Sequence, residues 1–224
     1  MPGKNSRKTY TENGYYHIYN RGVEKRVIFL DQQDYSVFLS YLKEYLLPKK
    51  EKELNQRLSN PQISSVERNK VLKSLHLNNF SQEITLLAYC LMPNHFHFFL
   101  KQKSTGAIDS FMNSLATRYT MYFNSKYKRV GHLYQGVYKA VLINNEGQFL
   151  HLSRYIHKQA LSLNNQPCSY PEYLGQRQTL WIKPDEILSH FSKTNPFLSY
   201  QNFVEQPEDK EKLKGLTLED KYRR

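Results

Sequence analysis

The chain has 224 residues, with 32 Lys and Arg against 20 Asp and Glu, and a formal net charge of +12 at pH 7. This length suits one domain with appendages, and the excess positive charge predicts a polyanionic partner, most simply nucleic acid. Two cysteines are too few for a disulfide framework, and there is neither a long apolar run nor an N-terminal signal, so we expect a cytoplasmic protein with no membrane partner.

The chain divides by composition into a central domain and appendages. Residues 1–13 are polar and basic, which is typical of a flexible arm, and residues 201–224 are rich in charge, which predicts a disordered tail. Between them we expect one domain over 14–200. It carries a surface insertion at about 48–82, which has too few apolar residues for its own core, and a C-terminal extension from about 164.

The first half of the domain predicts a strand, a helix and the insertion. Residues 15–20 are rich in aromatic and β-branched residues, and Arg21-Gly22 closes the strand. Acidic residues at 31 and 34 favour a helix start, and apolar residues repeat at helical spacing until Pro48. A short helix over 66–77 is predicted within the insertion.

Residues 84–90 and 95–100 predict a β-hairpin joined by a Pro-Asn turn. Because side chains alternate between the two faces of a strand, His95 and His97 lie on one side and Phe96 and Phe98 on the other. Two histidines on one face of an apolar strand suit a metal site or a polar active site. The alternative is a pair of half-exposed histidines, each satisfied by a hydrogen bond. His17 in the first strand can face the same site, although a structural role is the preferred interpretation.

The rest of the domain predicts a helix over 109–127, a strand-like stretch over 133–143, a turn over 144–147 and an amphipathic helix over 148–161. Strands mixed with long helices indicate an α+β fold with an antiparallel sheet covered by helices. Tyr155 and Gln159 are four residues apart, so they stack on one side of the last helix.

A phenol and an amide oxygen can then meet the two imidazoles where this helix packs on the sheet. Two imidazoles and one amide leave open positions on a divalent ion, which is the mark of a catalytic site, and these donors suit Mn²⁺ or Mg²⁺. A tyrosine hydroxyl aimed at a phosphorus can displace a 3′-oxygen and form a phosphotyrosine. Tyr119 is the best rival, but it has no ligand-type residue four positions along.

The residues 92–97 (Met-Pro-Asn-His-Phe-His) resemble the His–hydrophobic–His motif of HUH enzymes, and 155–159 (Tyr-Ile-His-Lys-Gln) resemble the Tyr-x-x-x-Gln helix of single-tyrosine HUH transposases. Residues 16–22 and 131–136 are similar to two strands of the same family, and the likeness extends over about 14–175. It is closest to the REP-associated tyrosine transposases.

The resemblance implies a ferredoxin-like HUH fold, Tyr155 as nucleophile, and His95, His97 and Gln159 as ligands of Mg²⁺ or Mn²⁺. It also implies single-stranded DNA with a hairpin as partner, a 5′-phosphotyrosine intermediate, and no small-molecule cofactor; monomer and homodimer both stay open. The predicted DNA contacts are basic residues and one tyrosine of these elements: Arg21, Arg118, Lys126, Lys128, Arg129, Tyr134, Lys139, Arg154 and Lys158.

The sequence departs from the REP-associated pattern at two places. Gln159-Ala160, which is similar to the insertion-sequence branch, stands where the REP-associated branch usually has Asn-Pro. Val137 stands where an arginine commonly follows Gly136. Two other functions stay open: a non-catalytic protein that binds hairpin DNA or RNA, and a nickase of the replication-initiator or relaxase type.

Overall fold

The computed structural model describes residues 8–163 and 166–207 of the chain. Four strands form one antiparallel sheet in the order β2-β3-β1-β4, which confirms the predicted α+β class. The chain order of strands and long helices is the βαββαβ of ferredoxin-like folds. The strands are β1 (Tyr15–Arg21), β2 (Ile84–Met92), β3 (His95–Gln102) and β4 (Lys139–Leu142).

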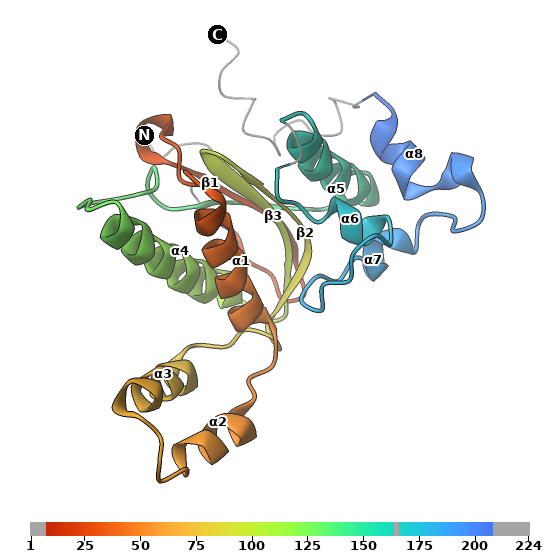
Figure 1. Ribbon diagram of the computed structural model, residues 1–224. Helices are drawn as coiled ribbons and strands as arrows, with labels where there is room; N and C mark the ends of the chain where they lie inside the picture. Colours follow the sequence, from red (N-terminus) through yellow and green to blue (C-terminus); the bar gives the residue numbers. More distant parts are fainter. Residues whose placement is uncertain (1–7, 164–165, 208–224) are drawn as a thin grey trace.

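Helices cover both faces of this sheet (Figure 1). On one face lie α1 (Gln32–Leu46) and α4 (Ala107–Lys126), and on the other lies α5 (Glu146–Leu161). The short α6 (Tyr170–Tyr173), α7 (Asp185–Leu188) and α8 (Tyr200–Glu205) follow on the α5 side, together with a 3-10 turn at Pro196–Leu198. A second 3-10 turn, Val23–Lys25, follows β1.

The alternation of side chains on β3 divides two hydrophobic cores. Phe96 and Phe98 belong to the core under α1 and α4, whereas Phe99 belongs to the core under α5. His97 is fully buried and has the same parity as Phe99, so it faces α5. The period-2 pattern of the hairpin therefore decides which helix the histidines meet.

The segment predicted as an insertion forms a pair of helices that extends away from the sheet (Figure 1). The second, α3 (Ser65–His76), agrees with the helix expected over 66–77, whereas α2 (Glu51–Leu58) was not predicted. The charges of this segment suit α2, because two acidic residues lie in its first turn and Arg57 in its last.

Three further expectations are corrected. The strand-like stretch 133–143 reduces to Lys139–Leu142, because Gly136 has a φ of +84° and breaks the extended backbone. Residues 8–13 of the expected arm are anchored, since Lys8 pairs with Asp109 at 2.7 Å; residues 1–7 lie outside the described residues. Residues 201–205 belong to α8 rather than to a tail, and residues 208–224 lie outside the described residues.

Asp34 joins α1 to the end of α4. Its carboxylate is fully buried and accepts from the Leu30 N–H at 2.8 Å, the Tyr127 hydroxyl at 2.9 Å and Lys126 Nζ at 2.8 Å. Burial alone raises a carboxyl pKa, but Lys126 and the other donors outweigh it and lower the pKa of Asp34 below its ordinary value.

We expect Asp34→Asn to lower the free energy of unfolding by about 1.5–3 kcal/mol, because an amide cannot accept from every one of these donors. The charged group stabilises the fold above the pKa of the unfolded chain, and that contribution disappears as pH falls through the lowered folded pKa. The gap between wild type and Asp34→Asn should therefore narrow below about pH 4. Urea unfolding at several pH values measures this difference in the free energy of unfolding. Glu53→Gln, at an exposed carboxylate, is the matched control.

Within the described residues, no helix is both long enough and apolar enough to cross a membrane.

Candidate active site

His97 lies at the centre of the α5 face and is fully buried. Its Nδ1 is 2.9 Å from Nε2 of His17, which projects from the neighbouring strand β1. Its Nε2 is also buried and has no hydrogen-bond partner among the described residues. Burial lowers the pKa of His97 well below its ordinary value, so the ring is neutral near pH 7 and offers a nitrogen lone pair.

His95 is the second histidine of the same face, and its ring centroid lies 5.0 Å from that of His97. Its Nδ1 is 2.6 Å from the side-chain oxygen of Asn94. Burial, together with a smaller contribution from the nearby Arg21 guanidinium, lowers the pKa of His95 to about 4. Arg21 stands opposite His95 in the β1–β3 register, which accounts for that effect.

Tyr155 reaches these histidines from α5 within the same chain. Its ring centroid is 5.4 Å from that of His97 and 6.0 Å from that of His17, and its side chain is buried. The helix positions it because Leu152, Ile156 and Ala160 form the buried stripe that packs on the sheet, as the spacing predicted. The meeting of phenol and imidazoles that the sequence predicts is thus present.

Gln159 lies one turn beyond Tyr155 on α5 and is half-buried. Among the described residues, no group of three or more His, Cys, Asp or Glu side chains can hold a metal ion. The expected set differs from such a group, since its third member is an amide. The donors nevertheless fit a divalent ion, because both imidazoles are kept neutral and the buried Nε2 of His97 lacks a partner.

Sequence reasoning missed the side chains that hold α5 in place. His157 donates from Nδ1 to the Tyr200 hydroxyl at 2.7 Å and accepts at Nε2 from the Ser169 hydroxyl at 2.8 Å. Burial lowers its pKa to about 3. Tyr200 and Ser169 come from the C-terminal extension, so α5 is enclosed between the sheet and that extension. A histidine two residues after Tyr155 was the available signal, but no local pattern identifies its distant partners.

The predicted DNA contacts fall into different environments. Several of them make hydrogen bonds or ion pairs within the protein. Arg118 pairs with Glu44 at 2.8 Å, Lys126 bridges to Asp31 and Asp34, and the almost fully buried Arg154 donates to the carbonyl of Phe203 and contacts His151. Lys158 donates to the Gln206 carbonyl, and Arg129 donates to the side chain of Asn124. The backbone of Lys128 is in the left-handed region, with a φ of +50°.

Two of the predicted contacts lie on the face that carries the histidines. Arg21 stands opposite His95, and Lys139 stands opposite Tyr19, whose ring lies 4.9 Å from that of His17. Residues directly opposite each other in antiparallel strands project to the same side, so Lys139 shares the face of His17.

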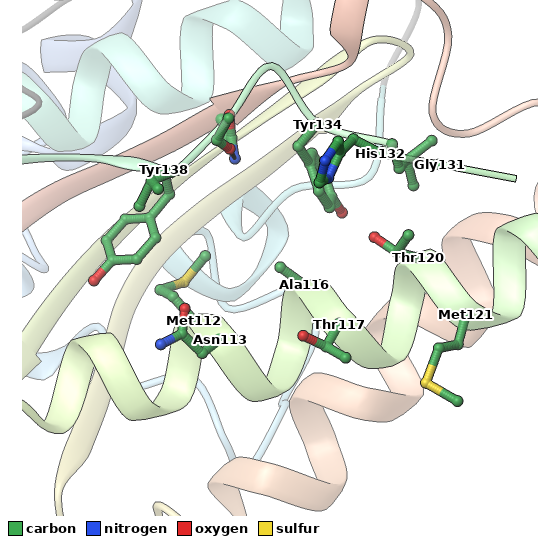
Figure 2. Close-up of a pocket in the computed structure, with 14 residues that line it drawn as sticks. Met112, Asn113, Ala116, Thr117, Thr120, Met121, Gly131, His132, Tyr134 and Tyr138 are labelled. Carbon is green, nitrogen blue, oxygen red and sulfur yellow. Dashed lines mark hydrogen bonds between the residues drawn. The ribbon is translucent and has the colours of Figure 1, made fainter. Parts of the chain in front are cut away.

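Tyr134 lies on the other side of the sheet, in the wall of a cavity of about 430 Å³ between α4 and residues 131–138 (Figure 2). Its hydroxyl is buried and has no hydrogen-bond partner in the described part of the chain. Met112, Ala116 and Thr120 of α4 form the opposite wall (Figure 2). Tyr134 is therefore separated from Tyr155 by the sheet.

Comparison with known proteins gives a family for the segment that carries the site. The model of the family described as "Transposase IS200 like" matches residues 59–159, which include both histidines of β3, Tyr155 and Gln159. The match also includes residues 59–82, so part of the predicted insertion falls within the family pattern. The segment that carries the site is therefore similar to that of a transposase. The match agrees with the resemblance to single-tyrosine HUH transposases that the motifs at 92–97 and 155–159 indicate.

Solved structures give weaker likenesses. A REP-associated tyrosine transposase bound to a REP hairpin is 10% identical with a TM-score of 0.48, covering 79% of this chain and 95% of its own. A putative transposase from Deinococcus radiodurans R1 is 16% identical with a TM-score of 0.28, and the match covers 69% of this chain and 96% of that protein. The tRNA(His) guanylyltransferase of Saccharomyces cerevisiae is 13% identical with a TM-score of 0.34, and the match covers 95% of this chain and 80% of that protein. No curated protein matches the chain.

Proposed function

We propose that this protein cleaves and rejoins single-stranded DNA near hairpins, through a 5′-phosphotyrosine formed on Tyr155. The observation that carries the proposal is the position of the Tyr155 ring, 5.4 Å from His97 on the face where His95 also lies. The match to the transposase family and the net charge of +12 support DNA as the partner. Because phenol and imidazoles belong to one chain, the geometry supports a site that needs no second copy.

The proposed reaction conserves the number of phosphodiester bonds. The Tyr155 oxygen forms a bond to phosphorus, the bond to the 3′-oxygen breaks, and the phenol proton passes to that leaving oxygen. A DNA 3′-hydroxyl then attacks the phosphotyrosine, which restores the phenol and joins a strand without a nucleotide cofactor. A Mg²⁺ or Mn²⁺ ion held by His95, His97 and Gln159 would neutralise charge on the phosphate.

Burial prepares Tyr155 and the histidines for these roles. The neutral imidazoles keep their lone pairs at neutral pH, and the packing of Tyr155 between α5 and the sheet limits the orientations of its ring. Because the folded protein already restricts the ring, less entropy is lost when the transition state forms. The position of Arg21 opposite His95 supports a role for its guanidinium in binding a phosphate beside the histidines.

The test uses single-stranded hairpin oligonucleotides, labelled at either end, with Mg²⁺, Mn²⁺ or EDTA. We expect a covalent protein–DNA product that carries the fragment 3′ of the cut, forms only with the divalent ion, and is consumed when a 3′-hydroxyl strand is added. Tight binding with no covalent product under either metal would instead support a non-catalytic hairpin-binding protein. A product that is never rejoined would support a nickase.

Lys139 provides a test of the DNA surface. We expect Lys139→Ala to weaken binding of single-stranded DNA and to reduce the slope of log K against log salt by about 0.7, because one phosphate contact is lost. Lys50→Ala, in the exposed ion pair with Glu53, is the control and should leave the slope unchanged. Fluorescence anisotropy between 50 and 200 mM salt measures both, and equal slopes for Lys139→Ala and wild type would remove Lys139 from the interface.

A further inference from the structure

His17 is a buried polar residue for which the proposed reaction has no use. It lies on β1 opposite Phe99 of β3, with its side chain fully buried on the α5 face. Its Nε2 is 2.9 Å from Nδ1 of His97, and the two rings stack with centroids 5.1 Å apart. An imidazole directly behind another imidazole controls where the second ring carries its proton.

One proton lies between these two nitrogens, and its position decides what the other side of His97 offers. If His97 donates from Nδ1, its Nε2 carries a lone pair. If His17 donates instead, neutral His97 carries its proton on Nε2, where a buried N–H has no acceptor among the described residues. An orphaned buried N–H is rare and costs free energy, so the first arrangement is favoured before a cation binds, and a cation that takes the lone pair favours it more.

We propose that His17 is a positioning residue, which accepts the Nδ1–H of His97 and thereby directs the Nε2 lone pair of His97 toward a divalent ion. The inference rests on the proposed function for the presence of that ion. Metal-bound histidines usually donate their second N–H to a fixed acceptor, and loss of such an acceptor typically lowers metal affinity by 10–100-fold. Here the acceptor is a second imidazole from the adjacent strand rather than a carboxylate or a backbone carbonyl.

The tautomer can be read without metal or DNA. In wild-type protein labelled with ¹⁵N-histidine, long-range ¹H–¹⁵N spectra at pH 7.5 should show His97 protonated at Nδ1, and the assignment is made by the loss of those signals in His97→Gln. In His17→Phe, which fills the space but cannot accept, we expect the Nε2-protonated form to appear. In His17→Gln, whose amide oxygen can accept, we expect the Nδ1-protonated form to be retained. A wild-type His97 protonated at Nε2 overturns the proposal.

Metal affinity gives the second measurement, by calorimetric titration with Mn²⁺ alone. We expect His17→Phe to bind Mn²⁺ about 10–100-fold more weakly than wild type and His17→Gln to bind within a few-fold of it. His190→Gln, at a partly exposed histidine outside the site, is the matched control and should bind as wild type does. Thermal unfolding of each variant separates loss of fold from loss of the ligand's orientation.

The two proposals fail in different ways. Equal Mn²⁺ affinity in wild type and His17→Phe, with both folded, overturns the role of His17 while the proposed reaction stands. A wild-type protein that binds no Mn²⁺ overturns the metal-dependent function, and with it the role of His17 toward an ion.

Discussion

Tyr155→Phe is expected to abolish the covalent protein–DNA product, with a rate at least about 10³-fold below that of wild type, because the substitution removes the proposed nucleophilic oxygen. The ring itself stays, so its packing between α5 and His97 is retained. DNA binding measured by anisotropy and the unfolding midpoint should therefore change little. The covalent product is measured as a denaturation-resistant band on a labelled hairpin oligonucleotide with Mn²⁺.

Tyr119→Phe is the matched control, because Tyr119 is the tyrosine that the sequence made the best rival. It is fully buried in the core on the other face of the sheet, where its hydroxyl donates to the Ile28 carbonyl at 2.6 Å. Loss of this hydroxyl in Tyr119→Phe should lower the free energy of unfolding by about 1 kcal/mol and leave the covalent product unchanged. A product that survives in Tyr155→Phe and disappears in Tyr119→Phe would contradict the proposal, because it would place the reaction on the face of the sheet that α1 and α4 cover.

Mixing two inactive variants tests whether one chain completes the site. Tyr155→Phe lacks the proposed nucleophile and His97→Ala lacks a proposed ligand. If each site is built within one chain, as the distance between the two rings supports, the mixture should form no product. Recovered product in the mixture would instead mean that a tyrosine from one copy acts beside the histidines of another.

The sequence predicted the sheet and the face of the site because both follow from local alternation. In β3, His97 and Phe98 differ by one residue and therefore lie in different environments, one under α5 and the other under α1 and α4. The α5 stripe followed in the same way from helical spacing. These patterns need only the geometry of a strand or helix, together with the rule that apolar side chains are buried.

The roles that escaped prediction depend on pairs of residues far apart in the chain. His17 was interpreted as a structural strand residue, although it contacts His97 eighty positions away. Arg154 was predicted to contact DNA, but it is buried against α8, which no pattern near residue 154 reveals. A basic side chain is equally suited to a phosphate and to a buried carbonyl, and only the folded chain distinguishes them.

The C-terminal extension holds α5 through a hydrogen-bonded series of side chains. The Ser169 hydroxyl donates to His157, His157 donates to the Tyr200 hydroxyl, and Tyr200 donates to Ser153 Oγ at 3.1 Å. Ser153 in turn donates to the Leu150 carbonyl at 2.7 Å. Because every member has a partner, the series can be buried without penalty, and removal of one member leaves its neighbours unsatisfied.

Tyr200→Ala should lower the free energy of unfolding by about 3–5 kcal/mol, because it leaves a cavity and removes the acceptor of His157. Tyr200→Phe keeps the ring and should lower it by about 1–3 kcal/mol. Phe197→Ala, at a side chain that is 83% exposed in the same extension, is the control and should stay within about 0.5 kcal/mol of wild type. Urea unfolding measures all three.

The pH dependence of stability separates this hydrogen-bonded series from simple packing. His157 is neutral in the fold, with its pKa lowered to about 3 by burial, whereas in the unfolded chain it titrates near 6.5. Protons therefore bind the unfolded chain first, and stability falls as pH decreases from about 6.5 toward 3, by up to about 1.4 kcal/mol per pH unit from this residue. In Tyr200→Ala, where water reaches His157, that part of the slope should shrink. If the slope and the unfolding midpoint both match those of wild type, the extension does not hold α5 on the sheet, and the position of Tyr155 must depend on the contacts of α5 with β2 and β3 alone.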